Sequence, residues 1–441
     1  MRILIMIKSL CVSTLVWLTF VWYGSGLMAA DIPSLVGNVS QDSIKKHVTA
    51  LCDAGGHQTR VNFTDGCYWS AEYIAQYFEQ LDHVHSVVRD SFTVYSHAAP
   101  YNTYPMINII ANFKSDDPDA ELILLGAHYD ASGSRESDWQ ENWKTMKAQG
   151  ADDNATGVAA IMEIGRILSQ NYADLALKHD IQLIAFAAEE YHPTNPNVHH
   201  AGSLWDAMHK SDNEEPLMAS IILDMIGYNN YYDYVEVISD NQSLWLADVV
   251  YENMQTYTPD LNTNSTPSDV SFSDHDSYQL YDFTSILLME NDRPWNNDSP
   301  YYQSNPYYHS RGDKIITLNF NQVEKVTQAA LASTVSLSSP QETGLVRQAP
   351  PEPQNNFSAV ISPNPFNHST SIRLTVNTAT PLTIDVFNAA GQKVEQICTG
   401  KNFYAGEHYV RWQAGTKASG VYYCRIHNGQ QQSIKKMMLL K

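Results

Sequence analysis

The sequence is poor in positive charge: its 441 residues include 27 Lys and Arg against 48 Asp and Glu, a formal net charge of −21. A nucleic-acid binder needs surplus Lys and Arg to neutralise phosphates, so this balance argues against nucleic acid as a partner. Charged residues make up 17% of the chain and hydrophobic residues 43%. This composition fits neither a disordered chain nor a coiled coil, and we expect a folded, globular protein.

Long hydrophobic runs are also scarce, and the clearest one stands at the N-terminus. Arg2 and Lys8 precede an apolar run over residues 10–23, and small residues close the stretch near Ala30. This order predicts a secretory signal peptide at residues 1–30. The run is shorter than the roughly 20 apolar residues of a membrane span, although an uncleaved anchor stays open as the alternative.

Cysteine is infrequent as well, and four cysteines follow the predicted signal peptide: Cys52, Cys67, Cys398 and Cys424. None of them has a CxxC spacing, which argues against a thiolate zinc site or a redox motif. An even number in an exported chain is compatible with two disulfides, most simply Cys52 with Cys67 and Cys398 with Cys424. Sequence alone does not determine the pairing.

Two domains are predicted on either side of a linker at residues 338–357, which is rich in Pro, Gln and Asn and has no hydrophobic period. Residues 31–356 hold 16 basic and 45 acidic side chains, a net charge of −29, whereas residues 357–441 hold 9 and 3, a net charge of +6. We therefore expect a large domain at 31–337 and a small domain at 358–441 with different roles.

Hydrophobic patterning separates the two domains further. Short, continuous apolar runs at 121–128, 181–190, 219–225 and 284–292 are typical of strands buried on both faces, and helical spacing lies between them, as at 154–170. This alternation predicts an α/β layer fold with a mostly parallel sheet. In the small domain, short alternating strands separated by turns predict an all-β sandwich of about 80 residues.

Histidines and carboxylates follow the apolar runs of the large domain: His128 and Asp130, Asp152 and Asp153, Glu189 and Glu190, Asp224, and later His309. The carboxyl ends of parallel strands meet at one edge of a sheet, so we expect these side chains to converge. Taken alone, each pair can also be explained without any function, as a helix cap, a turn or a solvated pair. Together they favour a divalent cation, because buried carboxylates are costly without one, and imidazole with carboxylate is the catalytic zinc pattern.

The motifs HxD, GADD, AAEE, LDM, SDH and HSxxD follow one another between Cys52 and Asp313. In this order they resemble the di-zinc aminopeptidases of peptidase family M28. The resemblance implies a three-layer α/β/α aminopeptidase-like domain with a mostly parallel central sheet. The sequence has neither HExxH nor GxSxG, which argues against a zincin or an α/β-hydrolase.

The resemblance also implies two zinc ions as cofactors. His128 and Asp224 would hold one ion, Glu190 and His309 would hold the other, and Asp152 would bridge both. In such a site two zinc ions share a water molecule, lower its pKa and polarise the scissile carbonyl.

Two further residues take catalytic roles by the same resemblance. Glu189 would be the general base, close to the metals but not bound to them, and would pass the proton of water to the leaving amine. Asp130 would fix the imidazole of His128. The loop after Glu190 is longer than is usual in the family and contains His192, His199 and His200, which we interpret as exposed loop residues, with an extra metal site as the alternative.

The tail from residue 361 resembles a type IX secretion sorting domain, whose family carries cargo across the outer membrane. The resemblance implies an exported protein, secreted or attached to the cell surface, that has the outer-membrane secretion machinery as a partner. A plain β-sandwich binding module is the alternative.

The expected function is a secreted zinc aminopeptidase that acts on peptide substrates. Three alternatives stay open. A carboxypeptidase or dipeptidase would need a cationic anchor for the substrate's carboxylate, and a glutaminyl-cyclase-like enzyme typically keeps one zinc. A catalytically inactive surface-binding protein is the third alternative, which the presence of Glu189 disfavours.

Overall fold

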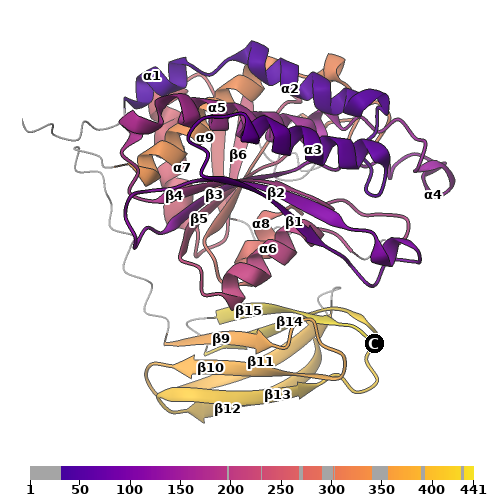
Figure 1. Cartoon of the computed structure of the whole chain (residues 1–441). Helices are drawn as coiled ribbons and strands as arrows, with labels where there is room; N and C mark the ends of the chain where they lie inside the picture. The colour runs from indigo at the N-terminus through magenta and orange to yellow at the C-terminus, as the bar shows by residue number, and fades with distance from the viewer. Residues whose placement is uncertain are drawn as a thin grey trace, which may run out of the picture.

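The computed structural model describes residues 31–195, 198–229, 231–267, 272–290, 301, 303–339, 356–388, 393–428 and 432–441. The predicted signal peptide and most of the predicted linker lie outside the described residues. Within them, a large α/β domain is followed by a small all-β domain, coloured yellow in Figure 1. No helix among the described residues is long and apolar enough to cross a membrane.

One sheet forms the centre of the large domain, with the strand order β1-β2-β4-β3-β5-β8-β6-β7. The central neighbours β4, β3, β5 and β8 run parallel, whereas β1, β2 and β6 join antiparallel. Leu, Ile and Ala fill the inner strands, which are buried on both faces as a covered parallel sheet requires. Its strands are β1 (Ser86–Phe92), β2 (Met106–Phe113), β3 (Leu122–His128), β4 (Asp180–Phe186), β5 (Leu217–Leu223), β6 (Tyr234–Ser239), β7 (Asn262–Pro267) and β8 (Ser285–Met289).

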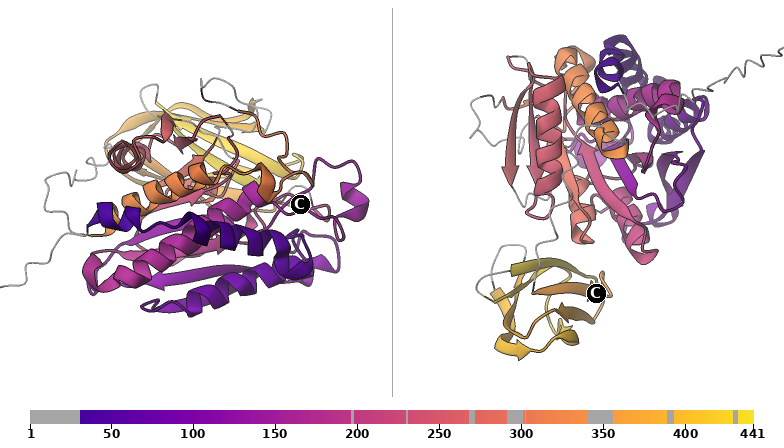
Figure 2. Two further views of the ribbon diagram at one scale, coloured as in Figure 1. Left: turned by 90° about the horizontal axis from the view of Figure 1, so that it is seen from above. Right: turned by 90° about the vertical axis from the view of Figure 1, so that its left-hand side faces the viewer.

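Helices cover both faces of this sheet, which confirms the three-layer α/β/α architecture (Figures 1 and 2). One face carries α1 (Ile32–Gly37), α2 (Gln41–Asp53), α3 (Asp65–Glu79), α5 (Gly157–Leu175), α7 (Leu244–Tyr257) and α9 (Phe320–Ser338). The other face carries α6 (Ala201–Asp212) and α8 (His275–Leu280), and the short helix α4 (Trp139–Asn142) lies in a loop. In α5, the apolar side chains of Val158, Ile161, Ile164 and Leu168 recur at helical spacing and are buried against the sheet.

The small domain packs a three-stranded sheet, β13-β10-β9, against a four-stranded sheet, β12-β11-β14-β15, and the strands pair antiparallel in both. Alternating side chains of the two sheets form its core around Trp412, Ile372 and Ile384, which confirms the predicted sandwich. Its strands are β9 (Phe357–Ser362), β10 (Ser369–Val376), β11 (Thr380–Asn388), β12 (Lys393–Phe403), β13 (Gly406–Gln413), β14 (Gly420–His427) and β15 (Gln432–Leu439).

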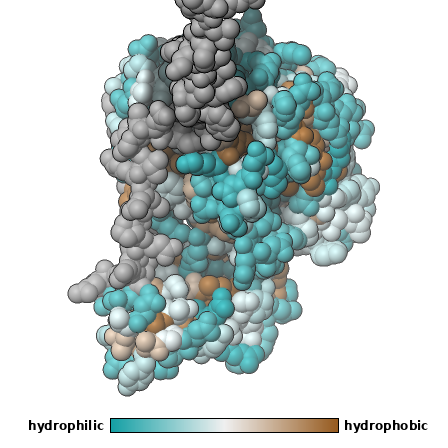
Figure 3. All heavy atoms as spheres, turned by 60° about the vertical axis from the view of Figure 1, so that its left-hand side comes forward, coloured by the Kyte–Doolittle hydropathy of each residue, from teal (hydrophilic) through white to brown (hydrophobic). Residues whose placement is uncertain are grey.

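Charge complementarity joins the two domains where β15 faces α8 (Figure 1). Lys436 Nζ lies 2.9 Å from Asp276 Oδ2, and Lys435 pairs with Asp282 in the same way. Both lysines belong to the domain with net positive charge, and both aspartates belong to the acidic one. Elsewhere, Figure 3 shows a face that is mainly hydrophilic, with small, separate hydrophobic areas.

The expected disulfides are absent among the described cysteines, since Cys52, Cys67, Cys398 and Cys424 are all free. Cys398 lies in β12 and Cys424 in β14, and β11 runs between these strands and pairs with both. Two strand spacings are about 10 Å, beyond the roughly 7 Å that a disulfide allows between Cα atoms. Cys67 instead lies 3.8 Å from Asn62 Oδ1.

Candidate metal centre

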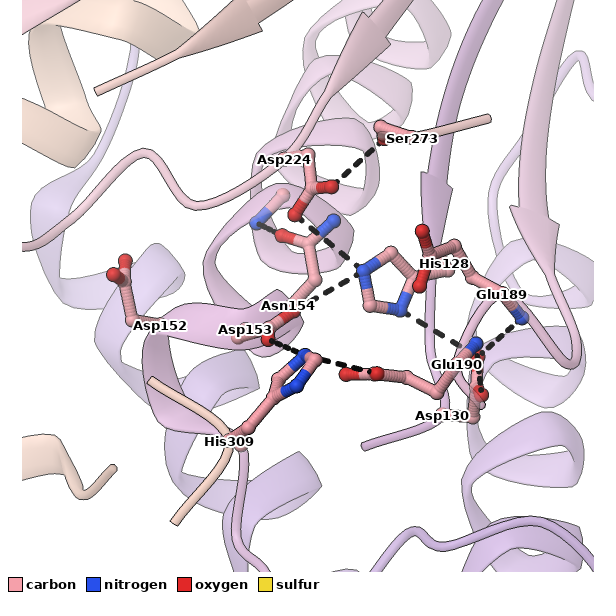
Figure 4. A network of polar contacts seen from close by, with 12 residues as sticks. His128, Asp130, Asp152, Asp153, Asn154, Glu189, Glu190, Asp224, Ser273 and His309 are labelled. Atoms are coloured by element: carbon pink, nitrogen blue, oxygen red, sulfur yellow. Dashed lines mark hydrogen bonds and ion pairs between the residues drawn. The ribbon is translucent and has the colours of Figure 1, made fainter. Parts of the chain in front are cut away.

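Parallel strands place most of the candidate residues at one edge of the sheet. His128 is the last residue of β3, and Glu190 and Asp224 follow β4 and β5, the two strands that flank β3 in parallel. Asp153 comes from the turn before α5, and His309 from the segment before α9. Figure 4 shows these side chains pointing toward one another.

The side chains form two groups that share Asp153. Asp153 Oδ1 lies 3.2 Å from His128 Nε2, which in turn lies 3.4 Å from Asp224 Oδ1. Asp153 Oδ2 lies 3.2 Å from His309 Nε2, which lies 2.9 Å from Glu190 Oε2. In each group the three candidate ligand atoms lie within 4.8 Å of one another. One carboxylate therefore offers a different oxygen to each group.

Asp152 is not part of either group, contrary to the expectation that it bridges the metals. Its side chain points away from them (Figure 4), and its Oδ1 accepts a hydrogen bond from Gly227 N at 2.8 Å. Its Oδ2 accepts one from Asn305 Nδ2 at 2.9 Å. The backbone at Asp153 is non-helical, with φ −108° and ψ 87°, so the two neighbouring side chains leave the chain on different sides.

Asp313 holds the turn that presents Asp153. Its two carboxylate oxygens accept the backbone N–H groups of Asp152 at 2.9 Å and Asp153 at 3.1 Å. In the sequence, Asp313 stands out only as the last residue of the HSxxD motif. No feature of the sequence indicates that it accepts hydrogen bonds from this turn.

Asp130 lies behind His128, with its Oδ1 3.5 Å from His128 Nδ1. It also accepts the backbone N–H groups of Glu189 and Glu190, each at 3.1 Å, and Asn62 Nδ2 at 2.7 Å. One buried carboxylate therefore holds the segment that carries the two glutamates and lies beside the imidazole of His128.

Two serines orient the remaining ligands, and neither was singled out in the sequence as an orienting residue. Ser273 Oγ donates to Asp224 Oδ2 at 2.7 Å, which leaves Asp224 Oδ1 toward His128. Ser134 Oγ lies 2.9 Å from His309 Nδ1, which leaves His309 Nε2 toward Asp153 and Glu190.

The electrostatics of the groups fit a cation. Burial raises the pKa of Glu190, and Asp153 adds to the effect, so that the pKa is about 8 despite the opposing charge of His309. Burial lowers the pKa of His309, but Glu190 and Asp153 outweigh burial and raise the pKa to about 10. Too little positive charge is present for so many buried carboxylates, and a bound divalent cation would correct this imbalance.

Several buried atoms of the residues in the two groups make no hydrogen bond within the described part of the chain: His128 Nε2, Asp224 Oδ1 and Glu190 Oε1. Buried polar atoms without partners are rare in proteins, and all three are zinc-ligand atoms. The donor set of imidazole nitrogen and carboxylate oxygen therefore fits zinc in both groups.

Glu189 lies next to the two groups without belonging to either. Its side chain is buried, and its Oε1 lies 3.0 Å from His200 Nε2. Burial raises the pKa of Glu189 well above its ordinary value, and the neighbouring charge of Glu190 adds to the effect while His128 opposes it. A basic carboxylate outside the ligand groups has the properties of a proton acceptor.

The histidines of the long loop are not simply exposed, contrary to our interpretation of the sequence. His192 and His200 are 2% and 5% exposed. His192 Nδ1 lies 2.8 Å from Thr194 Oγ1, and its ring packs edge-on against Trp143. Neither residue joins a candidate metal group among the described residues.

Comparisons with known proteins agree with this geometry. The model of peptidase family M28 matches residues 108–334, which include both groups, and that of a secretion system C-terminal sorting domain matches residues 360–440. The second match confirms the expected sorting domain and hence export to the cell surface or beyond. The uncharacterized protein YfbL of Escherichia coli (strain K12) is 28% identical over 325 residues, which cover 68% of this chain and 89% of that protein.

Solved structures share the fold of the large domain. The LapA aminopeptidase of Legionella pneumophila has a TM-score of 0.55 at 21% identity, over 70% of this chain and 75% of that one. The glutaminyl cyclase of Bacteroides thetaiotaomicron has a TM-score of 0.52 at 22% identity, over 67% of this chain and 97% of that one. The fold is therefore common to proteins of different activity, and the activity has to be argued from the site.

Proposed function

Because the chain belongs to peptidase family M28, we propose that it is an exported aminopeptidase that removes N-terminal residues from peptides with the help of two zinc ions. The observation that carries the proposal is the position of Asp153, whose two carboxylate oxygens face different ligand groups. A site for one ion would use one group only. The shared carboxylate favours two ions over the single zinc expected of a glutaminyl-cyclase-like enzyme.

The residues that would hold the ions follow from the two groups. His128 and Asp224 would bind one zinc, and Glu190 and His309 would bind the other. Asp153, which belongs to both groups, would face both ions, the role that the resemblance implied for Asp152. Bound zinc would supply Lewis acidity for the scissile carbonyl and would lower the pKa of water toward neutrality.

Glu189 provides the proton transfer that peptide hydrolysis needs. Its Oε1 lies 3.0 Å from His200 Nε2, so Oε2 is the atom that would take a proton from water and deliver it to the leaving amine. Because Glu189 lies three residues after the end of β4 and is adjacent to Glu190, it would lie beside the metals. Asp130 holds the backbone of both glutamates and so preserves this arrangement.

The charge of the large domain suits the proposed substrates. Residues 31–356 carry a net charge of −29, and the amino terminus of a peptide is cationic. The opposite charges would increase the rate at which peptide amino termini reach the site, an effect that salt weakens.

A dipeptidase is the second candidate, and Arg135 favours it. Arg135 is exposed, and its Cζ lies 4.7 Å from the ring centroid of Tyr308. The ring of Tyr308 stacks on that of His309 at 3.6 Å between centroids. A guanidinium in this position could bind the C-terminal carboxylate of a short peptide. Amidation of that carboxylate would then lower kcat/KM for dipeptides, whereas an aminopeptidase would tolerate it.

Metal analysis and paired peptides test the proposal together. We expect about two zinc ions per chain, hydrolysis of a peptide with a free amino terminus, and no hydrolysis of its N-acetylated form. Glu189→Gln should keep the zinc and lower kcat by roughly 10²- to 10⁴-fold, the usual contribution of a general base. Equal hydrolysis of the acetylated peptide, or unchanged kcat in Glu189→Gln, would contradict the proposal.

A further inference from the structure

The loop between Glu190 and α6 closes on a short set of backbone hydrogen bonds. His200 N donates to Glu189 O at 2.8 Å, Ala201 N to Ala188 O at 2.8 Å, and Gly202 N to Ala187 O at 3.0 Å. A Cβ at Gly202 would lie 2.3 Å from Ala187 O, so this close approach requires glycine. The closure places the backbone of His200 directly opposite that of Glu189.

The side chains of the same two residues also meet. His200 Nε2 lies 3.0 Å from Glu189 Oε1, and the two residues are 5% and 8% exposed. The ring of His199 packs edge-on against the His200 ring at 4.1 Å between centroids and helps to fix its orientation. Two buried polar atoms at this distance are close enough for a hydrogen bond.

We propose that His200 is a positioning residue for Glu189: it donates a hydrogen bond from Nε2 to Glu189 Oε1 and thereby keeps this carboxylate in place as the proton acceptor. The inference rests on the proposed function. It assigns to His200 a role in the site that the family motifs do not mark, because His200 belongs to the long loop in which this chain departs from the usual family pattern.

The physical need for such a residue follows from the position of Glu189. A carboxylate adjacent to a metal ligand is attracted to the same cations, and a carboxylate that binds metal can no longer take a proton. The hydrogen bond from His200 occupies one oxygen of Glu189 and leaves the other for water. Burial lowers the pKa of His200 well below its ordinary value, with His199 and Lys436 adding to the effect, so the ring is neutral and donates through one nitrogen.

Three variants test the inference. His200→Phe keeps a planar ring and removes the donor, and His200→Gln restores an amide donor. His199→Phe is the matched control, because it keeps a ring to pack against His200 and changes no described contact of the Glu189 carboxylate. We expect His200→Phe to lower kcat by about 10- to 100-fold, the usual effect of losing a partner behind a metal site. KM, zinc content and the melting temperature should stay close to those of the wild type, and His200→Gln should recover most of kcat.

A spectroscopic readout tests the contact without activity. In zinc-loaded protein labelled with ¹⁵N-histidine, the signal lost in His200→Gln should report a protonated Nε2, and Glu189→Ala should shift it. An unchanged kcat in His200→Phe would overturn the inference, and so would a His200 signal that does not shift in Glu189→Ala. Equal losses of zinc or melting temperature in His200→Phe and His200→Gln would assign His200 a structural role and overturn it as well.

If the wild type binds zinc but hydrolyses no peptide, the proposed function fails, and the spectroscopic readout still decides whether His200 holds Glu189. If the wild type is active and His200→Phe retains its kcat, the positioning role fails and the proposed function stands. The two failures are therefore distinguishable.

Discussion

The matched substitutions Asp153→Asn and Asp152→Asn separate two adjacent residues that a motif cannot tell apart. Asp153 offers one oxygen to each ligand group, at 3.2 Å from a histidine nitrogen in both. Asparagine has a single side-chain oxygen, so Asp153→Asn can serve one group at most. Asp152→Asn alters a side chain whose described partners, Gly227 N, Asn305 Nδ2 and Glu290, lie outside both ligand groups. It should therefore retain both ions.

The magnitude follows from the number of protein ligands. Binding of a structural zinc ion is worth about 10–16 kcal/mol, so one of three protein ligands accounts for about 3–5 kcal/mol. This corresponds to a loss of roughly 10²- to 10⁴-fold in affinity for the ion whose group loses its oxygen. We expect Asp153→Asn to hold no more than one zinc per chain in a zinc-buffered solution that keeps the wild type at about two.

The assay is metal analysis after equilibration with a zinc buffer, combined with thermal unfolding of the metal-free proteins to show that both variants fold. The reasoning would be refuted if Asp152→Asn lost zinc while Asp153→Asn kept two ions, because Asp152 would then be the bridging ligand. Retention of both ions in both variants would equally remove Asp153 from the bridging role.

Three further predictions concern the surroundings of the site and the core. Asp130→Asn should weaken zinc binding by about 10- to 100-fold, measured by competition with a chelator, because His128 and the two glutamate N–H groups lose their shared carboxylate. Gly202→Ala should lower the melting temperature and kcat together, because its Cβ would meet Ala187 O. His47 gives a pH dependence of stability, measured by urea unfolding: burial lowers its pKa from 6.5 to about 4, with Lys46 adding to the effect.

The sign for His47 follows from proton binding. As pH falls below 6.5, the unfolded chain takes up a proton at His47 that the folded chain does not take up until about pH 4, so stability falls across this window. The shift corresponds to at most about 3 kcal/mol, which His47→Gln should remove from the difference between pH 7 and pH 4. An identical pH dependence in wild type and His47→Gln would contradict this account. Unchanged zinc affinity in Asp130→Asn, or unchanged stability in Gly202→Ala, would contradict the other two predictions.

The sequence was sufficient to predict the fold class because buried parallel strands are continuous apolar runs. The runs that became β3 and β4 are of this kind, and their parallel pairing puts His128 and Glu190 at the same edge. The sequence therefore predicted, through the fold class alone, that these ligand residues lie close together.

The choice between Asp152 and Asp153 could not be made in the same way. Both residues have the same side chain and the same motif, and the direction of each depends on backbone angles in a turn that Asp313 holds from 160 residues away. His200 was misjudged for a similar reason, because its burial depends on hydrogen bonds across the base of a loop. The prediction of a disulfide between Cys398 and Cys424 was wrong because spacing along the chain does not reveal that β11 lies between their strands.

The most direct test of the central claim is anomalous diffraction at the zinc edge from crystals of the zinc-loaded protein. We expect two peaks about 3.5–4 Å apart, the separation usual for paired catalytic metals, with Asp153 between them. One ion should lie against His128 and Asp224, and the other against Glu190 and His309. A single peak, or two peaks that do not share Asp153, would contradict this claim.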